Sequence, residues 1–450
     1  MPEASYSVII NHRIGSFKNK IKVDSDKSIS QRGFIIGSIS EGVSKLKNVL
    51  ESDDIFSLIS CLKKLNCKIK KIKSGEYEVY GKGLGSLYCK KNTVLNFGNS
   101  GTALRICGFG VLGTNPNIQV KLTGDKSLSK RNMYKIMKTM ERFGVQFFPK
   151  NKFNLPLTLV SSEMPVGFNF EAGISSQIKS AVMLASINSF GKTLIVEKTK
   201  SRDHTERMLS HNKNAIKIKK GKTNLIEIIG KESIKPVNIS VPGDPSSASF
   251  YATLCLLNKH SKIILQDVQI NPTRVGFFNI IRKHSGKVSF KNKKKQGNEV
   301  VADVHVRSSK MKPLKVSEKF FTSCQDEIPI MTILACFLPG TSVFKGIGDL
   351  VNKESNRIKE MQKICKQIGI KTTASKNEMK IYGKSKFNLN NKKISVSGVL
   401  DHRILMSAAI LSLLTGVKAS LKNFEQVNSS CPNFLQIIRK LGGKFEKKRN

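Results

Sequence analysis

Asn-Phe-Gly-Asn-Ser-Gly-Thr-Ala-Leu-Arg, residues 96–105, opens an apolar segment of the chain. Its small polar residues stand where we expect a helix to begin. At such a helix start the first backbone N–H groups have no intrahelical partners. Asn99, Ser100 and Thr102 are good N-cap residues, and Gly101 lets a ligand approach the backbone closely. Because the helix dipole adds positive potential there, the stretch predicts an anion site. An ordinary capped core helix is the alternative interpretation.

Similar openings precede five other apolar runs, and their spacing is regular. Successive marks are 73, 75, 71, 80 and 75 residues apart, which predicts six repeats. The marks are Lys27, Ser100, Ser175, Ser246, Asp326 and Asp401. Amphipathic helices followed by Lys-rich strands form a second series, around Leu58, Ile136, Met208, Ile280, Met361 and Ile437. Each unit cannot bury its faces alone and needs its neighbours.

The length and composition fit two domains. With 450 residues and 39% hydrophobic content the chain can bury a large core, and six units divide into two domains of three. Residues 6–23 read as strands that precede the first unit, and the sixth unit lacks its strands, so we expect the former to complete the latter. This predicts a discontinuous domain of residues 1–23 plus 242–450 and a second domain of residues 24–241.

The formal net charge of +45 raises nucleic acid as a partner. The lysines, however, are spread through strand and turn segments, aromatic residues make up 7%, and there is no Trp. No aromatic platform for RNA is visible. We therefore interpret the charge as a solvated surface that attracts anionic substrates.

Targeting signals and metal motifs are not visible in the sequence. No apolar run approaches the roughly 18–20 residues needed to span a bilayer, and the first residues lack the apolar core of a signal peptide. The nine cysteines include no CxxC pair and no Cys/His cluster at zinc spacing. These features predict a cytoplasmic protein with reduced thiols and no structural metal.

Basic and hydroxyl side chains gather at two helix starts in the first half of the chain. Lys27, Ser28 and Arg32 combine fixed donors with a rigid guanidinium, which suits phosphate. The run 175–177, Ser-Ser-Gln, offers three hydrogen-bonding side chains where capping needs one. A basic surface helix is the alternative interpretation of the first group.

Acidic residues mark the second half. Asp326 precedes a buried apolar helix, where an acid stays ionised and can act as a base, although capping alone also explains it. Lys353 and Arg357 lie four apart with Glu354 beside the lysine, a pattern that a surface salt bridge also produces. Residues 401–403, Asp-His-Arg, close the series.

Together these motifs resemble one family, the enolpyruvyl transferases. The matching segments cover nearly the whole chain in the expected order, and they are residues 26–32, 98–105, 124–133, 175–177, 201–208, 241–250, 326–330, 353–357 and 401–404. The resemblance implies an α/β (α+β) fold with two domains, each an inside-out α/β barrel of three βαβαββ-type repeats. It also implies a double hinge near residues 23–24 and 241–242, with the active site in the interdomain cleft.

Within the family, the motifs are most similar to the enzymes that act on shikimate 3-phosphate. The implied reaction moves the enolpyruvyl group of phosphoenolpyruvate to the 5-hydroxyl of shikimate 3-phosphate, giving 5-enolpyruvylshikimate 3-phosphate and phosphate. It is a step of the shikimate pathway towards chorismate and the aromatic amino acids. The resemblance implies no cofactor, no membrane or specific nucleic-acid partner, and a monomer.

The resemblance also implies roles for individual residues. Asp326 would be the base for the hydroxyl, Glu354 the proton donor to the methylene, and Lys27 a third catalytic residue. Shikimate 3-phosphate would be bound by Lys27, Ser28, Arg32, Ser175, Ser176, Gln177, Arg202, Asp326 and Lys353. Phosphoenolpyruvate would be bound by Lys27, Asn99, Gly101, Arg131, Gln177, Arg357 and Arg403.

The sequence departs from the family pattern at four positions. The family usually has Asp at Asn356, often a valine-like residue at Asn352 and proline at Asn132, and some members have lysine near Ser429. We expect these differences to tune activity. Gly101 stands where some herbicide-tolerant members have alanine, which implies sensitivity to glyphosate.

Three alternatives stay open. The sister transferase that acts on UDP-N-acetylglucosamine shares the fold and reaction but is expected to carry a catalytic cysteine loop, and residues 113–126 contain no cysteine. A basic nucleic-acid-binding protein and an inactive relative that only binds anions are the other two.

Overall fold

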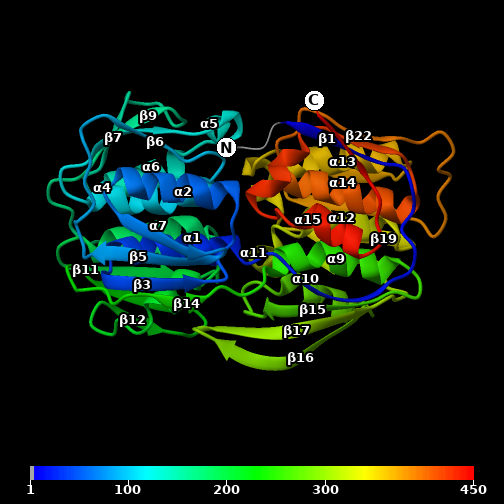
Figure 1. Cartoon of the computed structure of the whole chain (residues 1–450), viewed down its shortest axis with the longest axis horizontal. Helices are drawn as coiled ribbons and strands as arrows, with labels where there is room; N and C mark the ends of the chain where they lie inside the picture. Colours follow the sequence, from blue (N-terminus) through cyan, green and yellow to red (C-terminus); the bar gives the residue numbers. More distant parts are fainter. Residues whose placement is uncertain (1–4, 450) are drawn as a thin grey trace. The chain divides into compact units, whose positions relative to one another are not determined.

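The computed structural model describes residues 5–449 of the chain, which divides into two compact units. We name them by their place in the sequence (Figure 1). The terminal unit consists of the chain up to Asp24, Pro242–Lys295 and the chain from Glu299 onward. The central unit consists of Ser25–Val241 together with Gln296–Asn298, a short segment that the sequence analysis did not assign to it.

Each unit contains three four-stranded sheets. Those of the central unit have the strand orders β14-β3-β5-β4, β6-β7-β9-β8 and β10-β11-β13-β12. Its strands are β3 (Glu41–Lys47), β4 (Lys68–Lys73), β5 (Glu76–Lys82), β6 (Thr93–Asn96), β7 (Gln119–Thr123), β8 (Gln146–Phe148), β9 (Leu157–Val160), β10 (Phe170–Ala172), β11 (Lys192–Glu197), β12 (Ile216–Lys219), β13 (Asn224–Ile229) and β14 (Asn238–Ser240).

The sheets of the terminal unit have the orders β16-β17-β15-β2, β18-β19-β21-β20 and β22-β23-β1-β24. Its strands are β1 (Tyr6–Ile10), β2 (Lys18–Lys22), β15 (Lys262–Gln269), β16 (Lys287–Gln296), β17 (Glu299–Arg307), β18 (Lys315–Val316), β19 (Gly340–Lys345), β20 (Thr372–Ala374), β21 (Glu378–Gly383), β22 (Ile394–Val396), β23 (Ala419–Leu421) and β24 (Glu446–Arg449).

The six sheets repeat one pattern, in which an edge strand runs parallel to its neighbour. The parallel pairs are β14 with β3, β6 with β7, β10 with β11, β2 with β15, β18 with β19 and β22 with β23. This pattern confirms the predicted α/β fold of six repeats, three in each unit.

The prediction for the N-terminal strands was half right. Strand β1 pairs with β23 and β24 and so completes the sixth repeat, as expected. Strand β2 instead pairs with β15 and completes the fourth repeat. In the central unit β14 pairs with β3 in the same way, across most of that unit's sequence. Each unit is thus closed on itself by strands that are distant in sequence.

The helices of the central unit follow the predicted alternation of apolar and amphipathic segments. They are α1 (Lys27–Ile39), α2 (Asp53–Lys64), α3 (Gly101–Ala103), the π-helix η1 (Leu104–Val111), α4 (Leu112–Thr114), α5 (Lys126–Lys130), α6 (Tyr134–Glu141), α7 (Ser176–Ile187) and α8 (His204–Leu209). Those of the terminal unit are α9 (Pro245–Leu257), α10 (Gly276–Lys283), η2 (Glu318–Phe320), α11 (Phe321–Cys324), α12 (Ile328–Cys336), η3 (Gly348–Asn352), α13 (Arg357–Gln367), α14 (His402–Thr415), η4 (Phe424–Ser429) and α15 (Phe434–Lys440).

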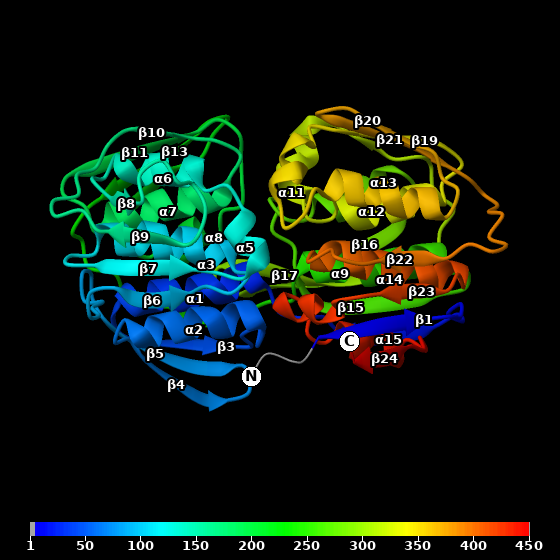
Figure 2. The ribbon, with the colours of Figure 1, turned by 90° about the horizontal axis from the view of Figure 1, so that it is seen from above.

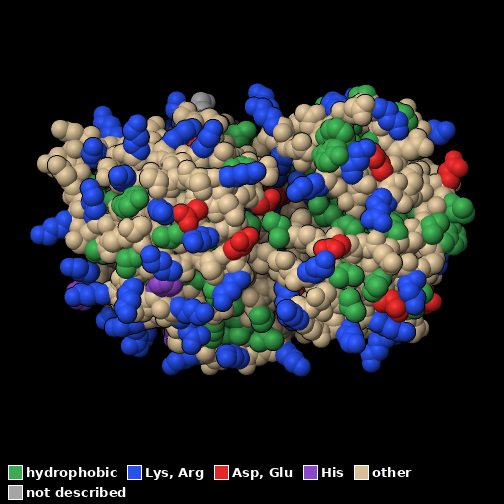
Figure 3. All heavy atoms as spheres, turned by 180° about the vertical axis from the view of Figure 1, so that it is seen from behind, with side chains coloured by type: hydrophobic (Ala, Val, Ile, Leu, Met, Phe, Trp, Pro, Cys, Tyr) green, Lys and Arg blue, Asp and Glu red, His purple; other side chains and the backbone are tan. Residues whose placement is uncertain are grey.

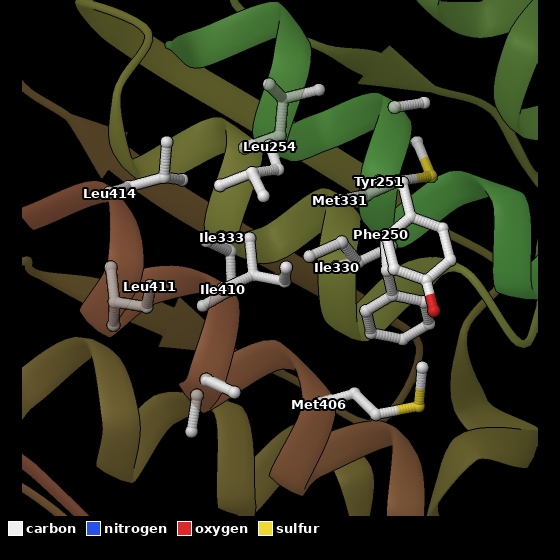
Figure 4. Packing of buried hydrophobic residues seen from close by; sticks show 14 of the residues in the cluster. Phe250, Tyr251, Leu254, Ile330, Met331, Ile333, Met406, Ile410, Leu411 and Leu414 are labelled. Atoms are coloured by element: carbon white, nitrogen blue, oxygen red, sulfur yellow. The ribbon is translucent and has the colours of Figure 1, made fainter. Parts of the chain in front are cut away.

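One apolar helix of each repeat fills the core of its unit. In the terminal unit these are α9, α12 and α14, which are apolar on nearly every side and pack on one another (Figures 2 and 4). Leu254, Ile333 and Ile410 are fully buried where they meet. Truncating such a side chain to alanine costs about 2–5 kcal/mol of folding free energy. Because their packing is this tight, the helices are held in fixed positions, and so are their N-termini.

Polar side chains cap the buried helices at the predicted openings. Asp26, Ser100, Ser175, Asp244 and Asp401 each accept a hydrogen bond from a backbone N–H in the first turn of the helix that follows. Five helix N-termini are therefore held in place by short polar side chains, as their sequences predicted.

The basic residues are dispersed over the surface. Figure 3 shows Lys and Arg side chains scattered across the visible face without gathering in a single patch. Within residues 5–449 no helix has the length and apolar character that crossing a membrane requires.

Asp24, where the chain leaves the terminal unit, is a buried acid with an unusual environment. Its Oδ1 accepts hydrogen bonds from the backbone N and Nδ2 of Asn433, while Oδ2 has no hydrogen-bond partner among the described residues. Burial raises the pKa of Asp24 from 3.8 to about 6, with a smaller contribution from Asp244. The folded protein therefore binds the carboxyl proton of Asp24 more tightly than the unfolded chain does.

We predict that Asp24→Asn stabilises the protein above pH 6. A raised acid pKa contributes stability that is present below pH 3.8 and is lost as the pH rises through about 6. The loss amounts to roughly 3 kcal/mol for a shift of about two pKa units. The free energies of unfolding of wild type and variant, measured with urea, are expected to diverge as the pH rises from 3.8 through about 6. The exposed Glu163→Gln is the matched control, and a difference that does not change with pH would contradict the prediction.

Candidate functional site

The candidate residues form two half-sites, one in each unit, and most of them lie at or just before helix N-termini; Arg131 is instead the C-cap of α5, and Lys353 the C-cap of η3. In the central unit, Lys27 is the first residue of α1 and its Nζ lies 2.9 Å from Oδ2 of Asp54 in α2. Asp54 is 4% exposed at its side chain, and its Oδ1 has no partner among the described residues. Sequence reasoning missed Asp54, although Ser52, Asp53 and Asp54 together form a typical acidic helix start.

Arg32 lies one turn further along α1 and is 2% exposed. Its Nε donates to Thr205 Oγ1 at 2.9 Å and its Nη2 donates to Ser180 Oγ at 3.0 Å. Its Nη1 donates to the carbonyl oxygen of Ser28 at 3.0 Å. The structure thus fixes this guanidinium through three of its nitrogens, between α1, α7 and α8.

The opening stretch brings two arginines beside Gly101. Arg131 Nη2 donates to Asn99 Oδ1. A Cβ added at Gly101 would lie 2.8 Å from Nη1 of Arg131 and 2.8 Å from Nη1 of Arg105. Both distances are shorter than a side chain tolerates, so only glycine allows both guanidinium groups to approach this helix start.

Gln177 joins the start of α7 to the same stretch. Its Oε1 accepts from Arg105 Nη1 at 2.8 Å, and its Nε2 donates to Thr102 Oγ1 at 2.9 Å. Arg105 was quoted in the opening stretch but was not predicted as a site residue. Its signal was its place one turn after Gly101, on the same face of the helix.

The remaining candidates of the central unit also lie at helix starts. Ser175 caps α7, Ser176 is its first residue, and Ser28 is the second residue of α1. Arg202 lies between β11 and α8, directly after Ser201, whose N and Oγ both donate to Glu197 Oε1. All candidates from this half of the sequence therefore gather around α1, α3, α5, α7 and α8.

In the terminal unit, Arg357 brings three carboxylates together. Its Nη1 lies 3.1 Å from Asp326 Oδ1, its Nη2 lies 2.6 Å from Glu354 Oε2, and its Nε lies 3.0 Å from Asp401 Oδ2. Arg357 and Asp401 are buried, whereas the side chains of Asp326 and Glu354 are 21% and 18% exposed. Two partly accessible acids are thus held next to each other by one guanidinium.

The charges of this cluster favour the ionised guanidinium. Burial alone would lower the pKa of Arg357, but Asp401, Glu354 and Asp326 outweigh it and raise that pKa well above its usual value. Of the residues considered as a surface salt bridge from the sequence, Glu354 and Arg357 belong to this network, whereas Lys353 lies before α13 and pairs with Asp349.

Arg403 is the second buried arginine of this half-site. It is 4% exposed and lies with its guanidinium 5.7 Å from the ring of Phe250. Its Nε and Nη1 have no hydrogen-bond partner among residues 5–449. A buried cation with unsatisfied donors is the arrangement expected of an anion-binding residue.

Lys353 and two positions at which the sequence differs from the family pattern, Asn356 and Ser429, also lie in the terminal unit. Lys353 Nζ donates to Gln325 Oε1 and to Asp349 Oδ2, each at 2.8 Å. Asn356, where the family has Asp, accepts from the backbone N of Lys359 at 3.1 Å and so still caps α13. Ser429 is buried in η4, with its hydroxyl donating to the carbonyl oxygen of Gln426. Among the described residues, no group of three or more His, Cys, Asp and Glu side chains could hold a metal ion.

The family described as EPSP synthase (3-phosphoshikimate 1-carboxyvinyltransferase) matches residues 12–438. The chain belongs to the EPSP synthase family. A 3-phosphoshikimate 1-carboxyvinyltransferase of Paracoccus denitrificans is 33% identical over 96% of this chain and 97% of its own length. One of Sulfurihydrogenibium is 35% identical over 95% of this chain and 98% of its own length.

Solved structures give the same family and fold. EPSP synthase of Acinetobacter baumannii has a TM-score of 0.82 and 30% identity, covering 99% of this chain and 100% of that one. The enolpyruvyl transferase NikO of Streptomyces tendae has a TM-score of 0.72 at 13% identity, a likeness of fold alone. The predicted membership of the enolpyruvyl transferases is confirmed.

Proposed function

We propose that the two half-sites act together in the reaction of the EPSP synthase family. This chain transfers the enolpyruvyl group of phosphoenolpyruvate to the 5-hydroxyl of shikimate 3-phosphate, releasing phosphate. The proposal depends most on the Arg357 cluster, because it holds Asp326 and Glu354 next to each other and partly accessible. The double hinge near residues 23–24 and 241–242, and closure around a site between the units, are parts of this proposal.

Shikimate 3-phosphate carries a phosphate, a carboxylate and hydroxyl groups. We assign its binding to Lys27, Ser28, Arg32, Ser175, Ser176, Gln177 and Arg202 of the central unit, with Asp326 and Lys353 of the terminal unit. Support comes from the helix starts: Ser175 caps α7, and the fixed guanidinium of Arg32 lies against the same helix. Backbone N–H groups, hydroxyls and cations at helix N-termini are the donors that phosphate prefers.

Phosphoenolpyruvate brings a phosphate and a carboxylate. We assign its binding to Lys27, Asn99, Gly101, Arg131 and Gln177 of the central unit, with Arg357 and Arg403 of the terminal unit. The unsatisfied Nε and Nη1 of Arg403 support the second half of this set. Arginine forks match carboxylate and phosphate oxygens in pairs.

The chemistry needs one base and one acid. Asp326 accepts the proton of the 5-hydroxyl as its oxygen attacks C2 of phosphoenolpyruvate, and Glu354 gives a proton to C3. In the second step C3 returns a proton to Glu354, and the phosphate that leaves the tetrahedral intermediate takes up the proton held by Asp326. The arginines stabilise the phosphate and carboxylate charges throughout.

The direct test is phosphate release by the purified protein. Release is expected only when phosphoenolpyruvate and shikimate 3-phosphate are both present. UDP-N-acetylglucosamine in place of shikimate 3-phosphate is the control for the sister activity. No release from a folded protein would contradict the proposal, and a salt-sensitive gel shift with nucleic acid would then support the basic binding protein.

We predict that Gly101→Ala raises KM for phosphoenolpyruvate by about tenfold or more, because the new Cβ displaces the guanidinium groups of Arg131 and Arg105. The displaced atoms are ends of flexible side chains, so stability is expected to change by less than about 0.5 kcal/mol. Gly15→Ala, where a Cβ meets nothing within 4 Å, is the matched control. Glyphosate inhibition is expected to weaken in parallel. An unchanged KM would show that Arg131 does not bind this substrate.

We further infer that the enzyme works as a cytoplasmic monomer. All nine cysteines are free thiols, as expected in a reducing compartment. Sedimentation of the purified chain tests the oligomeric state, and a mass of 50.0 kDa is expected.

A further inference from the structure

Lys179 of α7 is a fully buried lysine that holds two carboxylates. Its Nζ lies 2.5 Å from Glu197 Oε1 and 2.6 Å from Glu206 Oε1, and its side chain is 0% exposed. Glu197 ends β11 and Glu206 lies in α8, so one ammonium group ties three elements together. Lysine is almost never fully buried, because desolvation of its charge is costly. An apolar side chain would pack in this position without that cost, so we expect Lys179 to have a role beyond packing.

The neighbours of this ion cluster are the groups that fix Arg32. Ser180 follows Lys179 directly, and Thr205 precedes Glu206 directly. Thr205 Oγ1 donates to Ser180 Oγ at 2.8 Å, and both hydroxyls accept from the guanidinium of Arg32. The ion pair between α7 and α8 therefore lies one residue away from the two contacts that hold Arg32.

Glu197, the other carboxylate that Lys179 contacts, binds the loop before α8. Glu197 Oε1 accepts from the backbone N of Ser201 at 3.0 Å and from its hydroxyl at 2.9 Å. Its Oε2 accepts from Asn224 Nδ2 at 2.8 Å. Through Glu197 the same ammonium thus anchors the chain segment that leads into α8.

The charges of the cluster are unequal. Burial would raise the pKa of Glu197, but Lys179 and Asn224 outweigh it and lower that pKa. Burial dominates at Glu206 and raises its pKa, and its Oε2 has no hydrogen-bond partner among the described residues. Glu197 is the firmly ionised partner, and Glu206 completes the bridge to α8.

We propose that Lys179 is a positioning residue for the shikimate 3-phosphate half-site. By joining α7 to α8 through Glu206, it keeps Ser180 and Thr205 at the spacing in which both bind the Arg32 guanidinium. The inference rests on the proposed function, because it takes Arg32 as a ligand of shikimate 3-phosphate. Lys179 itself touches no substrate.

The test is a double-mutant cycle on KM for shikimate 3-phosphate. Lys179→Met is expected to raise this KM about tenfold, with kcat and KM for phosphoenolpyruvate changed less than about threefold. Arg32→Met alone is expected to raise the same KM at least as much. In the Arg32→Met background, Lys179→Met is expected to add less than about a further twofold, because its effect passes through Arg32.

Two further variants separate positioning from folding. Lys192 is an exposed lysine on β11, the strand that also holds Glu197, and it pairs with Glu227 of β13. The control variant Lys192→Met is expected to leave all kinetic parameters unchanged. If Lys179→Met does not fold, the triple variant Lys179→Met/Glu197→Gln/Glu206→Gln leaves no buried charge unpaired and is measured instead. The same rise in KM for shikimate 3-phosphate is expected from it.

The outcomes distinguish the inference from the function on which it rests. If Arg32→Met raises KM for shikimate 3-phosphate and Lys179→Met does not, only the positioning role is overturned. If Arg32→Met has no effect either, the assignment of Arg32 as a ligand falls with it. Equal losses in kcat and in both KM values, additive with Arg32→Met, would mark Lys179 as a structural residue and overturn the proposal.

Discussion

Replacing Glu354 by glutamine is expected to lower kcat by roughly 10²–10⁴-fold. The amide cannot give a proton to C3 of phosphoenolpyruvate, but it keeps the shape of the side chain. Its oxygen can still accept from Arg357 Nη2, which lies 2.6 Å from Glu354 Oε2 in the structure. KM for both substrates is therefore expected to change little, and steady-state phosphate release measures both parameters.

A second catalytic variant, Asp326→Asn, and a control variant, Glu360→Gln, change residues of the same unit. Asp326→Asn is expected to lower kcat similarly, because the amide cannot accept the proton of the 5-hydroxyl. Glu360→Gln changes a carboxylate of α13 that pairs with the exposed Lys363 at 2.7 Å, and is expected to leave kcat unchanged. A Glu354→Gln enzyme that keeps wild-type kcat would refute the role of Glu354 as proton donor.

Replacing Arg357 by methionine is expected to reduce both stability and activity. The change leaves Asp401, which is 0% exposed, without its cation, and breaking a buried pair in this way costs about 3–5 kcal/mol. It also removes the guanidinium that holds Asp326 and Glu354 together, so kcat/KM for phosphoenolpyruvate is expected to fall by about 10³-fold or more. Urea unfolding and phosphate release measure the two effects.

Two other arginine variants make this result specific. Arg357→Lys keeps the charge but loses the fork, and is expected to recover part of the stability and little of the activity. Arg439→Met removes an exposed arginine that lies 4.5 Å from the ring centroid of Phe445 in the same unit, and is expected to cost less than about 0.5 kcal/mol. Full activity in Arg357→Met would exclude Arg357 from substrate binding.

The repeats were predictable because their signals are local. A polar cap followed by an apolar run marks most of the buried helices within a few residues, as at Ser100 and Asp401. The exception is α12, whose N-cap residue Glu327 makes no side-chain capping hydrogen bond. Strand pairing was predictable only where the repeat itself supplied the partner. The pairing of β2 with β15 joins Lys18 to Lys262, and nothing in the sequence of either strand specifies the other.

The site was predictable residue by residue, but its network was not. Motif positions gave Asp326, Glu354 and Arg357 as separate candidates, whereas their convergence needs α12, α13 and α14 packed together. Asp54 and Lys179 were missed because each looks like an ordinary helix residue until its partner is known. The sequence predicts which groups carry charge, and packing decides which of them meet.

The pairing of β1 with β23 and β24 sets an order in which the protein can be built. A ribosome makes β1 long before its partners, since Val8 pairs with Leu421 and with Lys447. The central unit, by contrast, is nearly continuous in sequence and has all its strands once Val241 has emerged. Because domains generally fold as units during synthesis, the central unit can be complete before β23 and β24, the partners of β1, have been made. A chain that stops before β23 would carry a folded central unit and a terminal unit with β1 unpaired.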